Sequence, residues 1–382
     1  RPRSFSPTGG LRGGLGGAGL EAHVLTWTGA RPTEGVQDAA RRARYRLLAE
    51  WCASHNVRDL LVGHTMDDQA ETVLQRLNRG SGTTGLSGMA AESWIAAGAG
   101  APVRLLRPLL GVRRAALQAT LDRFDQPYWS DRANEDERFE RVRLRRALAA
   151  GSAGLSVEAL ARTARRALAA QEALSAAARP LVKPADAGLG VLALDGEGLA
   201  RAPAEVARTA FRLAMAATTG GGYPPQSEAV DRALATLAGD GGAASLGGCL
   251  MSRRDGAIEV MREPAALTGR SGSPAPSPLA VSGDAPALWD RRFVVRATGI
   301  SGATVEVGPV AETGLALLKE AGCEIGARRA AAWASAPMLY VDGAPAAQPQ
   351  AGFVSPAAER AGVAFDALFV GAEQLERRLV RY

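Results

Sequence analysis

The sequence predicts an α/β protein with a doubly wound, mostly parallel sheet, followed by a helical region and a small α+β C-terminal domain. Short apolar runs at 22–27 and 59–63 are each followed by a stretch with the 3.6-residue period of an amphipathic helix. A strand, helix, strand, helix order implies parallel strands joined by right-handed crossovers. The chain is organised around residues 60–72, where an apolar run turns into an acidic helix start.

In the first half, the predicted elements are strand 22–27, helix 36–51, strand 59–63, helix 66–77, strand 103–106 and helix 112–124. In the second half, they are helices 155–178, 205–217 and 227–237, hairpin 245–260, strands 292–296, 304–307 and 338–341, and helix 311–321. Such helical and α+β modules more often pack or bind than catalyse.

Composition excludes several classes of protein. The chain has 382 residues, of which 47% are hydrophobic and 22% charged, as in an ordinary soluble protein. No apolar run is long enough for a membrane span, so we expect no membrane association. Three widely separated cysteines predict neither a disulfide framework nor a zinc site, and they fit a reducing cytoplasm. The net charge of +6 permits a polyanionic partner, but only Lys183 and Lys319 are lysines, a bias that a GC-rich genome also explains.

The strand-to-helix turn carries the candidate catalytic residues. Thr65 and Asp68 have the spacing of a capping box, which is the structural explanation for these residues. Capping does not require the third carboxylate: Asp67, Asp68 and Glu71 crowd one helical surface, where a cation such as nucleotide-bound Mg²⁺ would relieve their repulsion. His64 could donate to a phosphate or carbonyl, or it could be satisfied by backbone in the turn.

Two further segments could meet phosphates. The Gly-rich loop 80–89, flanked by Arg76 and Arg79, can bring backbone amides close to a phosphate, or it is a plain solvated loop. Arg138, Arg141 and Arg145 recur at i, i+3 and i+7, so they form a stripe that could follow a nucleic-acid backbone or simply face solvent.

Several ordered blocks resemble the tRNA(Ile)-lysidine synthetases, an ATP-pyrophosphatase (PP-loop) family with a doubly wound sheet. The blocks are 64–72, 76–82, 85–89, 106–110 and 131–136. The resemblance implies an ATP-dependent ligase that uses ATP and Mg²⁺. It would adenylate the carbonyl of the wobble cytosine in the CAU anticodon of tRNA(Ile), and free L-lysine would then displace AMP. Assembly as a monomer or a homodimer is left open.

The resemblance also implies roles for single residues. Asp67, Asp68 and Glu71 would handle metal, lysine or protons, with Mg²⁺ assigned to Asp67 and Asp68. The remaining assignments are nucleotide or cytidine contacts for His64 and Arg107, pocket-shaping for Asp131 and Asn134, and tRNA phosphate contacts for Arg79, Arg141 and Arg145. Where the family usually has Arg-Asn-Arg-Ile-Arg, this chain has Arg141-Val142-Arg143-Leu144-Arg145, which removes one amide.

The family also carries a Ser-Gly-Gly-x-Asp-Ser phosphate loop, and no such run occurs in this sequence. We therefore expect the first strand, the phosphate loop and the first helix to be missing. The predicted organisation is a flexible Gly-rich lead at 1–20, an incomplete ATP-pyrophosphatase-like domain at 21–150, a helical accessory domain at 151–242 and a C-terminal α+β domain at 243–382.

Two alternatives are a tRNA-binding remnant that cannot activate ATP, and a PP-loop tRNA thiolase. The isolated cysteines argue against the thiolase, because that chemistry depends on cysteine pairs or an iron-sulfur cluster.

Overall fold

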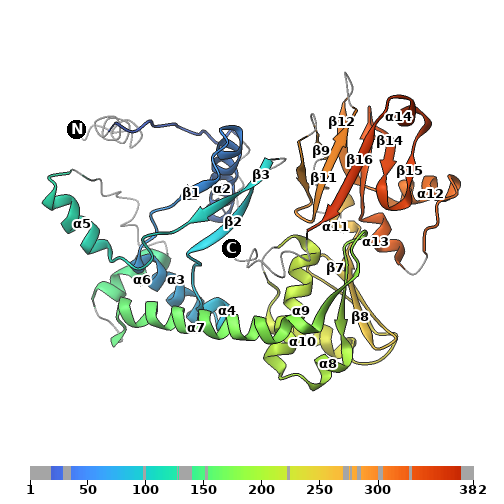
Figure 1. The fold of residues 1–382 in the computed structure, drawn as a ribbon. Coiled ribbons are helices and arrows are strands. Elements are labelled where there is room, and N and C mark those ends of the chain that lie inside the picture. Colours follow the sequence, from blue (N-terminus) through green and yellow to red (C-terminus); the bar gives the residue numbers. More distant parts are fainter. Residues whose placement is uncertain are drawn as a thin grey trace. The chain divides into compact units, whose positions relative to one another are not determined.

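The computed structural model (Figure 1) describes residues 19–28, 36–97, 100–126, 128, 140–150, 154–221, 224–269, 275, 278–281, 285–299, 304–326 and 329–370. The chain divides into two compact units. Unit 1 comprises Arg1–Ile95 and Val103–Leu168, and unit 2 comprises Ala96–Pro102 and Ala169–Tyr382.

The elements of the first half are α2 (Val36–Ser54), β1 (Asp59–Leu61), α3 (Met66–Asn78), α4 (Thr83–Leu86), β2 (Glu92–Ala97), β3 (Gly100–Leu106), α5 (Arg114–Arg123), α6 (Glu140–Ala149) and α7 (Val157–Ala178). The sheet has the order β1-β3-β2, and β1 pairs with β3 in parallel, with Leu61 opposite Leu106. The prediction of an α/β fold is confirmed at this coarse level.

The prediction of a strand at 22–27 is wrong. Residues 19–28 are described and contain no strand, and Val24 is exposed. A strand needs a neighbour that accepts and donates its backbone hydrogen bonds, and among the described strands β1 pairs only with β3. Strand β2 was not predicted.

The core of unit 1 lies between α3 and α7. Ala70 and Val73 on α3 pack with Val157, Leu160 and Ala164 at the start of α7. This is the apolar face that the 3.6-residue period predicts for α3, so its opposite edge is left for polar contacts.

The elements of the second half are η3 (Arg179–Leu181), β4 (Val182–Asp186), β5 (Val191–Asp195), α8 (Gly196–Arg201), α9 (Ala204–Thr219), α10 (Ser227–Thr236), β6 (Ala243–Leu246), β7 (Cys249–Arg254), β8 (Ala257–Arg262), α11 (Ala265–Thr268), β9 (Leu279–Ala280), β10 (Ala287–Trp289), β11 (Phe293–Thr298), β12 (Val305–Pro309), α12 (Ala311–Glu320), α13 (Ala330–Ala334), β13 (Pro337–Val341), β14 (Ala344–Gln348), η5 (Pro349–Ala351), β15 (Phe353–Val354), α14 (Pro356–Arg360) and β16 (Ala364–Phe369).

The described residues of unit 2 form three antiparallel sheets, with the orders β4-β5-β8-β7-β6, β15-β14-β13-β12-β9 and β10-β11-β16. Helix α9 packs on β5 and β8 (Figure 1). The predicted hairpin is confirmed: Arg254 pairs with Ala257, and Asp255 and Gly256 between them both have positive φ, as a type I′ turn requires.

None of the helices in the described part of the chain is both long and apolar enough to cross a membrane. The three cysteines are free thiols.

Candidate functional site

The candidate site lies at the carboxyl ends of β1 and β3. The Val62 N–H donates to the Leu106 carbonyl (2.9 Å), which brings the turn at His64 next to the turn at Arg107. The Met66 N–H donates to the Val112 carbonyl (2.9 Å), so the segment leading into α5 docks onto the start of α3. Ligands in open α/β sheets bind at such strand ends.

The capping box predicted at the start of α3 is confirmed. The Thr65 hydroxyl and amide both donate to Asp68 Oδ2 (2.6 and 2.8 Å), and the Asp68 amide faces the Thr65 hydroxyl at 3.4 Å. Burial favours a higher pKa for the Asp68 carboxyl. The hydrogen bonds from Thr65 and the charge of Arg114 outweigh burial and hold this pKa below its ordinary value.

Asp67 and Asp68 are held by two consecutive arginines at the start of α5. Arg113 Nε lies 3.3 Å from both oxygens of Asp67, and the Arg114 amide donates to Asp67 Oδ2 (2.7 Å). Arg114 Nη2 donates to Asp68 Oδ1 (3.0 Å). Arg113 also forms an ion pair with Glu158 of α7, so one guanidinium bridges α3 and α7.

Glu71 is paired with Arg145 of α6. Arg145 Nε donates to Glu71 Oε1 (2.7 Å), and Nη2 donates to Oε2 (3.3 Å). The Glu71 side chain is only 2% exposed, so its negative charge is compensated inside the protein. The hydrogen bond to Glu71, with the charges of Asp68 and Asp67, raises the pKa of Arg145.

These pairs change the electrostatic prediction made from the sequence. The three carboxylates do crowd one end of α3, but in the structure arginine side chains compensate them. Within the described residues, no group of three or more His, Cys, Asp or Glu side chains is arranged to hold a metal ion.

The side chain of Arg107, at the turn that follows β3, is buried. It is 4% exposed, and its Nη1 donates to the Ala90 carbonyl (2.8 Å) and the Ser93 hydroxyl (3.1 Å). Its Nε is buried and has no hydrogen-bond partner in the described structure. Burial lowers the pKa of Arg107, and Tyr45 of α2 opposes that shift.

The other predicted arginines lie on or beside α6. Arg79, at the end of α3, forms an ion pair with Glu140 (3.1 Å), the first residue of α6. The hydrogen bond from Gln75 and the charge of Arg79 lower the pKa of Glu140. Arg141 belongs to α6, but its side chain is outside the described part. Asp131 and Asn134 also lie outside the described residues.

The Gly-rich loop is folded against α3. The Gln69 side chain donates to the Met89 carbonyl (3.0 Å) and accepts from the Met89 amide (2.7 Å), and Arg76 Nη1 donates to the carbonyls of Gly85 and Gly88. Gly88 has φ +66°, and a Cβ there would lie 2.7 Å from the Gln69 amide. Several amides of the loop donate to carbonyls of the loop itself or of α3, so those groups are not presented to a phosphate.

Sequence reasoning missed Arg113, Arg114 and Glu158. The sequence did contain an indication of their role. Two arginines at the start of a helix lie next to the positive end of the helix macrodipole, where a positive charge is unfavourable. Such a placement indicates nearby carboxylates, and Asp67 and Asp68 are those carboxylates.

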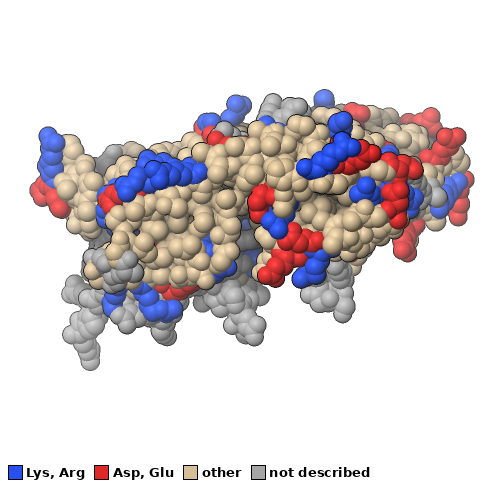
Figure 2. All heavy atoms as spheres, turned by 90° about the horizontal axis from the view of Figure 1, so that it is seen from below, with Lys and Arg blue, Asp and Glu red and all other residues tan. Residues whose placement is uncertain are grey.

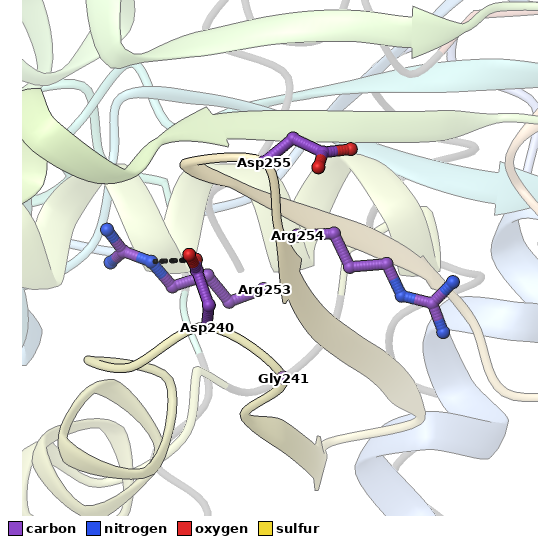
Figure 3. A pocket seen from close by; sticks show the side chains of 5 residues that line it. All are labelled: Asp240, Gly241, Arg253, Arg254 and Asp255. Carbon is purple, nitrogen blue, oxygen red and sulfur yellow. Dashed lines mark ion pairs between the residues drawn. The ribbon is translucent and has the colours of Figure 1, made fainter.

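Unit 2 offers a separate, shallow pocket at the β7–β8 turn (Figure 3). It is lined by Asp240, Gly241, Arg253, Arg254 and Asp255. Arg253 Nε lies 3.5 Å from Asp240, so one of its two arginines already has an anionic partner. This mixed lining gives the pocket no clear preference for a charged ligand.

The sequence of this chain is similar to those of known proteins. A PP-loop domain model matches residues 18–152. The tRNA(Ile)-lysidine synthase of Ruegeria pomeroyi is 36% identical over 79% of this chain and 68% of its own length. The tRNA(Ile)-lysidine synthase of a Methylobacterium species is 39% identical over 69% of this chain and 78% of its own length, and that of Methylobacterium nodulans is 37% identical over 70% and 81%.

Proposed function

The chain belongs to the tRNA(Ile)-lysidine synthase family, and we propose that the turn between β1 and α3 is its reaction site. Membership of this family, together with the match to a PP-loop domain, makes the protein an ATP-dependent ligase that acts on tRNA(Ile). The resemblance inferred from the sequence is thereby confirmed. The match to a PP-loop domain over residues 18–152 supports a doubly wound ATP-pyrophosphatase fold for unit 1.

One observation carries the site assignment. Asp67, Asp68 and Glu71 meet arginines from α5 and α6 at the carboxyl ends of two parallel strands. This is the edge at which α/β sheets bind their ligands, and the PP-loop match covers it. A plain helix cap needs only the Thr65–Asp68 pair.

The reaction proposed for this site has two steps. The carbonyl oxygen of the wobble cytosine attacks the α-phosphorus of ATP, and pyrophosphate leaves. The amine of free L-lysine then attacks the activated carbon, loses a proton and releases AMP. The first step develops negative charge at phosphate, which arginines stabilise, and the second needs a carboxylate that accepts a proton.

The side chains suit different parts of this work. Asp67 and Asp68 are partly exposed (19% and 20%), so they can meet lysine. Glu71 is buried against Arg145, which assigns it to holding the site together. Arg113 and Arg114 place guanidinium groups beside the carboxylates, and phosphate oxygens that bind there would compete with Asp67, Asp68 and Glu158 for them.

In this proposal, Mg²⁺ would bind together with the phosphates of ATP. Proteins usually hold Mg²⁺ by one or two carboxylates together with substrate phosphates. Asp67 and Asp68 are the carboxylates in reach, but as the chain is folded their oxygens already accept bonds from Thr65, Arg113 and Arg114. Asp67 and Asp68 would have to give up some of these bonds to hold Mg²⁺, and neither step of the proposed reaction is assigned to the metal.

The test measures ATP-dependent incorporation of labelled lysine into a tRNA(Ile) transcript with a CAU anticodon, together with pyrophosphate release. A transcript with adenine in place of the wobble cytosine serves as the control substrate. We expect Asp67→Asn to lower lysine incorporation at least tenfold with tRNA binding unchanged. Binding of tRNA by the wild-type chain without pyrophosphate release would instead support the alternative of a tRNA-binding remnant that cannot activate ATP.

A further inference from the structure

Helix α7 carries a basic surface that the proposed reaction site does not use. Arg162, Arg165 and Arg166 are exposed and lie at i, i+3 and i+4 on this helix. Within the described part of the chain, none of the three has an ion pair or a side-chain hydrogen bond. We refer to these three residues as the α7 arginine face.

The α7 arginine face cannot turn inward. The opposite side of the helix packs Val157, Leu160 and Ala164 into the core of unit 1, so the arginines are fixed toward solvent. Figure 2 is seen from below, the side on which α7 is drawn in Figure 1, and shows Lys and Arg side chains, in blue, in a short row on this face.

This surface differs from the arginines that sequence reasoning assigned to tRNA. Arg79 and Arg145 already form ion pairs with Glu140 and Glu71. An RNA phosphate would have to compete with those carboxylates, whereas the α7 arginine face offers three uncommitted positive charges.

The α7 arginine face begins beside the reaction site. Arg113 contacts both Asp67 of α3 and Glu158 of α7. Arg162 follows Glu158 by four residues, so it lies on the same side of the helix, about 6 Å further along the axis. An RNA that places its base at the acidic turn therefore brings its backbone within reach of α7.

We propose that Arg162, Arg165 and Arg166 bind the phosphate backbone of the RNA next to the reacting cytidine. This inference rests on the proposed function, because it takes the tRNA as the partner.

The test compares two triple variants of the full chain that lose the same charge. One carries Arg162→Gln, Arg165→Gln and Arg166→Gln. The control carries Arg44→Gln, Arg232→Gln and Arg360→Gln, all exposed arginines on other helices. Binding to the CAU tRNA(Ile) transcript is measured at several salt concentrations, and far-UV circular dichroism checks the fold.

We expect the α7 triple to weaken binding at least tenfold and to reduce the slope of log K against log salt by about two to three, because each phosphate contact contributes about 0.7–0.9 to that slope. The control should change the slope by less than about one. Equal changes in both triples would overturn the assignment to α7. Equally tight binding of polyglutamate would overturn RNA as the partner, and a wild-type chain that binds no tRNA would overturn the proposed function itself.

Discussion

Asp68 accepts three hydrogen bonds at once, from the Thr65 amide, the Thr65 hydroxyl and the Arg114 guanidinium. Its pKa is therefore lower in the folded protein than in the unfolded chain. A carboxyl whose folded pKa is depressed stabilises the fold above its unfolded pKa, which is about 3.9 for Asp. This contribution is lost as the pH falls through the folded pKa.

Asp68→Asn should reveal this dependence. At pH 7 we expect the variant to lose about 1–2 kcal/mol of unfolding free energy, because the cap and the partner of Arg114 are both weakened. The difference between wild type and variant should shrink below about pH 4, when Asp68 becomes protonated. Urea unfolding at pH 7, 5 and 3 measures it, and a difference that stays constant across this range would contradict the explanation.

Gln69 provides a second prediction for a single side chain. It is buried and makes two hydrogen bonds to the Met89 backbone. Gln69→Ala leaves a buried amide and a buried carbonyl unsatisfied, so we expect a loss of about 2–3 kcal/mol of unfolding free energy. The control is Gln118→Ala on the exposed side of α5, which should change stability by less than about 0.5 kcal/mol.

Helices α3 and α6 are joined by polar contacts at both ends of their interface. Arg145 pairs with Glu71 at one end, and Glu140 accepts from Gln75 and Arg79 at the other. The buried Glu71 makes the first contact the more important one, because removing its partner leaves an uncompensated charge.

Arg145→Gln should therefore destabilise unit 1 by about 3 kcal/mol. The double variant Arg145→Gln with Glu71→Gln should recover a large part of the loss, since no buried charge remains. Guanidinium unfolding of both variants checks this. A single variant as stable as wild type would show that Glu71 does not need Arg145.

Helices such as α3, α7 and α9 were predictable because their signals are local, whereas the short helices α4, α8, α11, α13 and α14 were not predicted. The apolar stripe of α3 and the spacing of Thr65 and Asp68 specify that helix without reference to the rest of the fold. Strands depend on partners distant in sequence. The run at 22–27 has strand composition, but no strand in the described part of the chain pairs with it. Glu92–Ala97 forms β2 without a clear alternating pattern.

At the scale of the molecule, the two units have separate hydrophobic cores. Val73 belongs to the core shared by α3 and α7, and Phe211 belongs to the core under the antiparallel sheets of unit 2. Val73 is 1% exposed and Phe211 is 0% exposed. We therefore expect unfolding in two steps, one for each unit.

Two core substitutions test this. Val73→Ala should cost about 2–3 kcal/mol and shift only the transition of unit 1, and Phe211→Ala should cost about 3–5 kcal/mol and shift only that of unit 2. Hydrogen exchange followed by mass spectrometry assigns each transition. A single transition that moves with either substitution would show that the units unfold together.

The grouping of the three carboxylates was predictable from the sequence, but their pairing with arginines was not. Asp67, Asp68 and Glu71 are neighbours in sequence, so helix geometry alone groups them. Their partners Arg113 and Arg145 lie far along the chain, and only the docking of α5 and α6 onto α3 brings them close. A sequence motif shows one side of an ion pair more readily than the other.

Strand β1 has a consequence for how this protein behaves at high concentration. It is the outermost strand of its sheet among the described strands, and Leu61 on it is 63% exposed. An edge strand with unpaired backbone N–H and C=O groups, next to an exposed hydrophobic side chain, can pair with a strand of another chain. High protein concentration would therefore favour aggregation through this edge strand, and a charged side chain in place of Leu61 would oppose that aggregation.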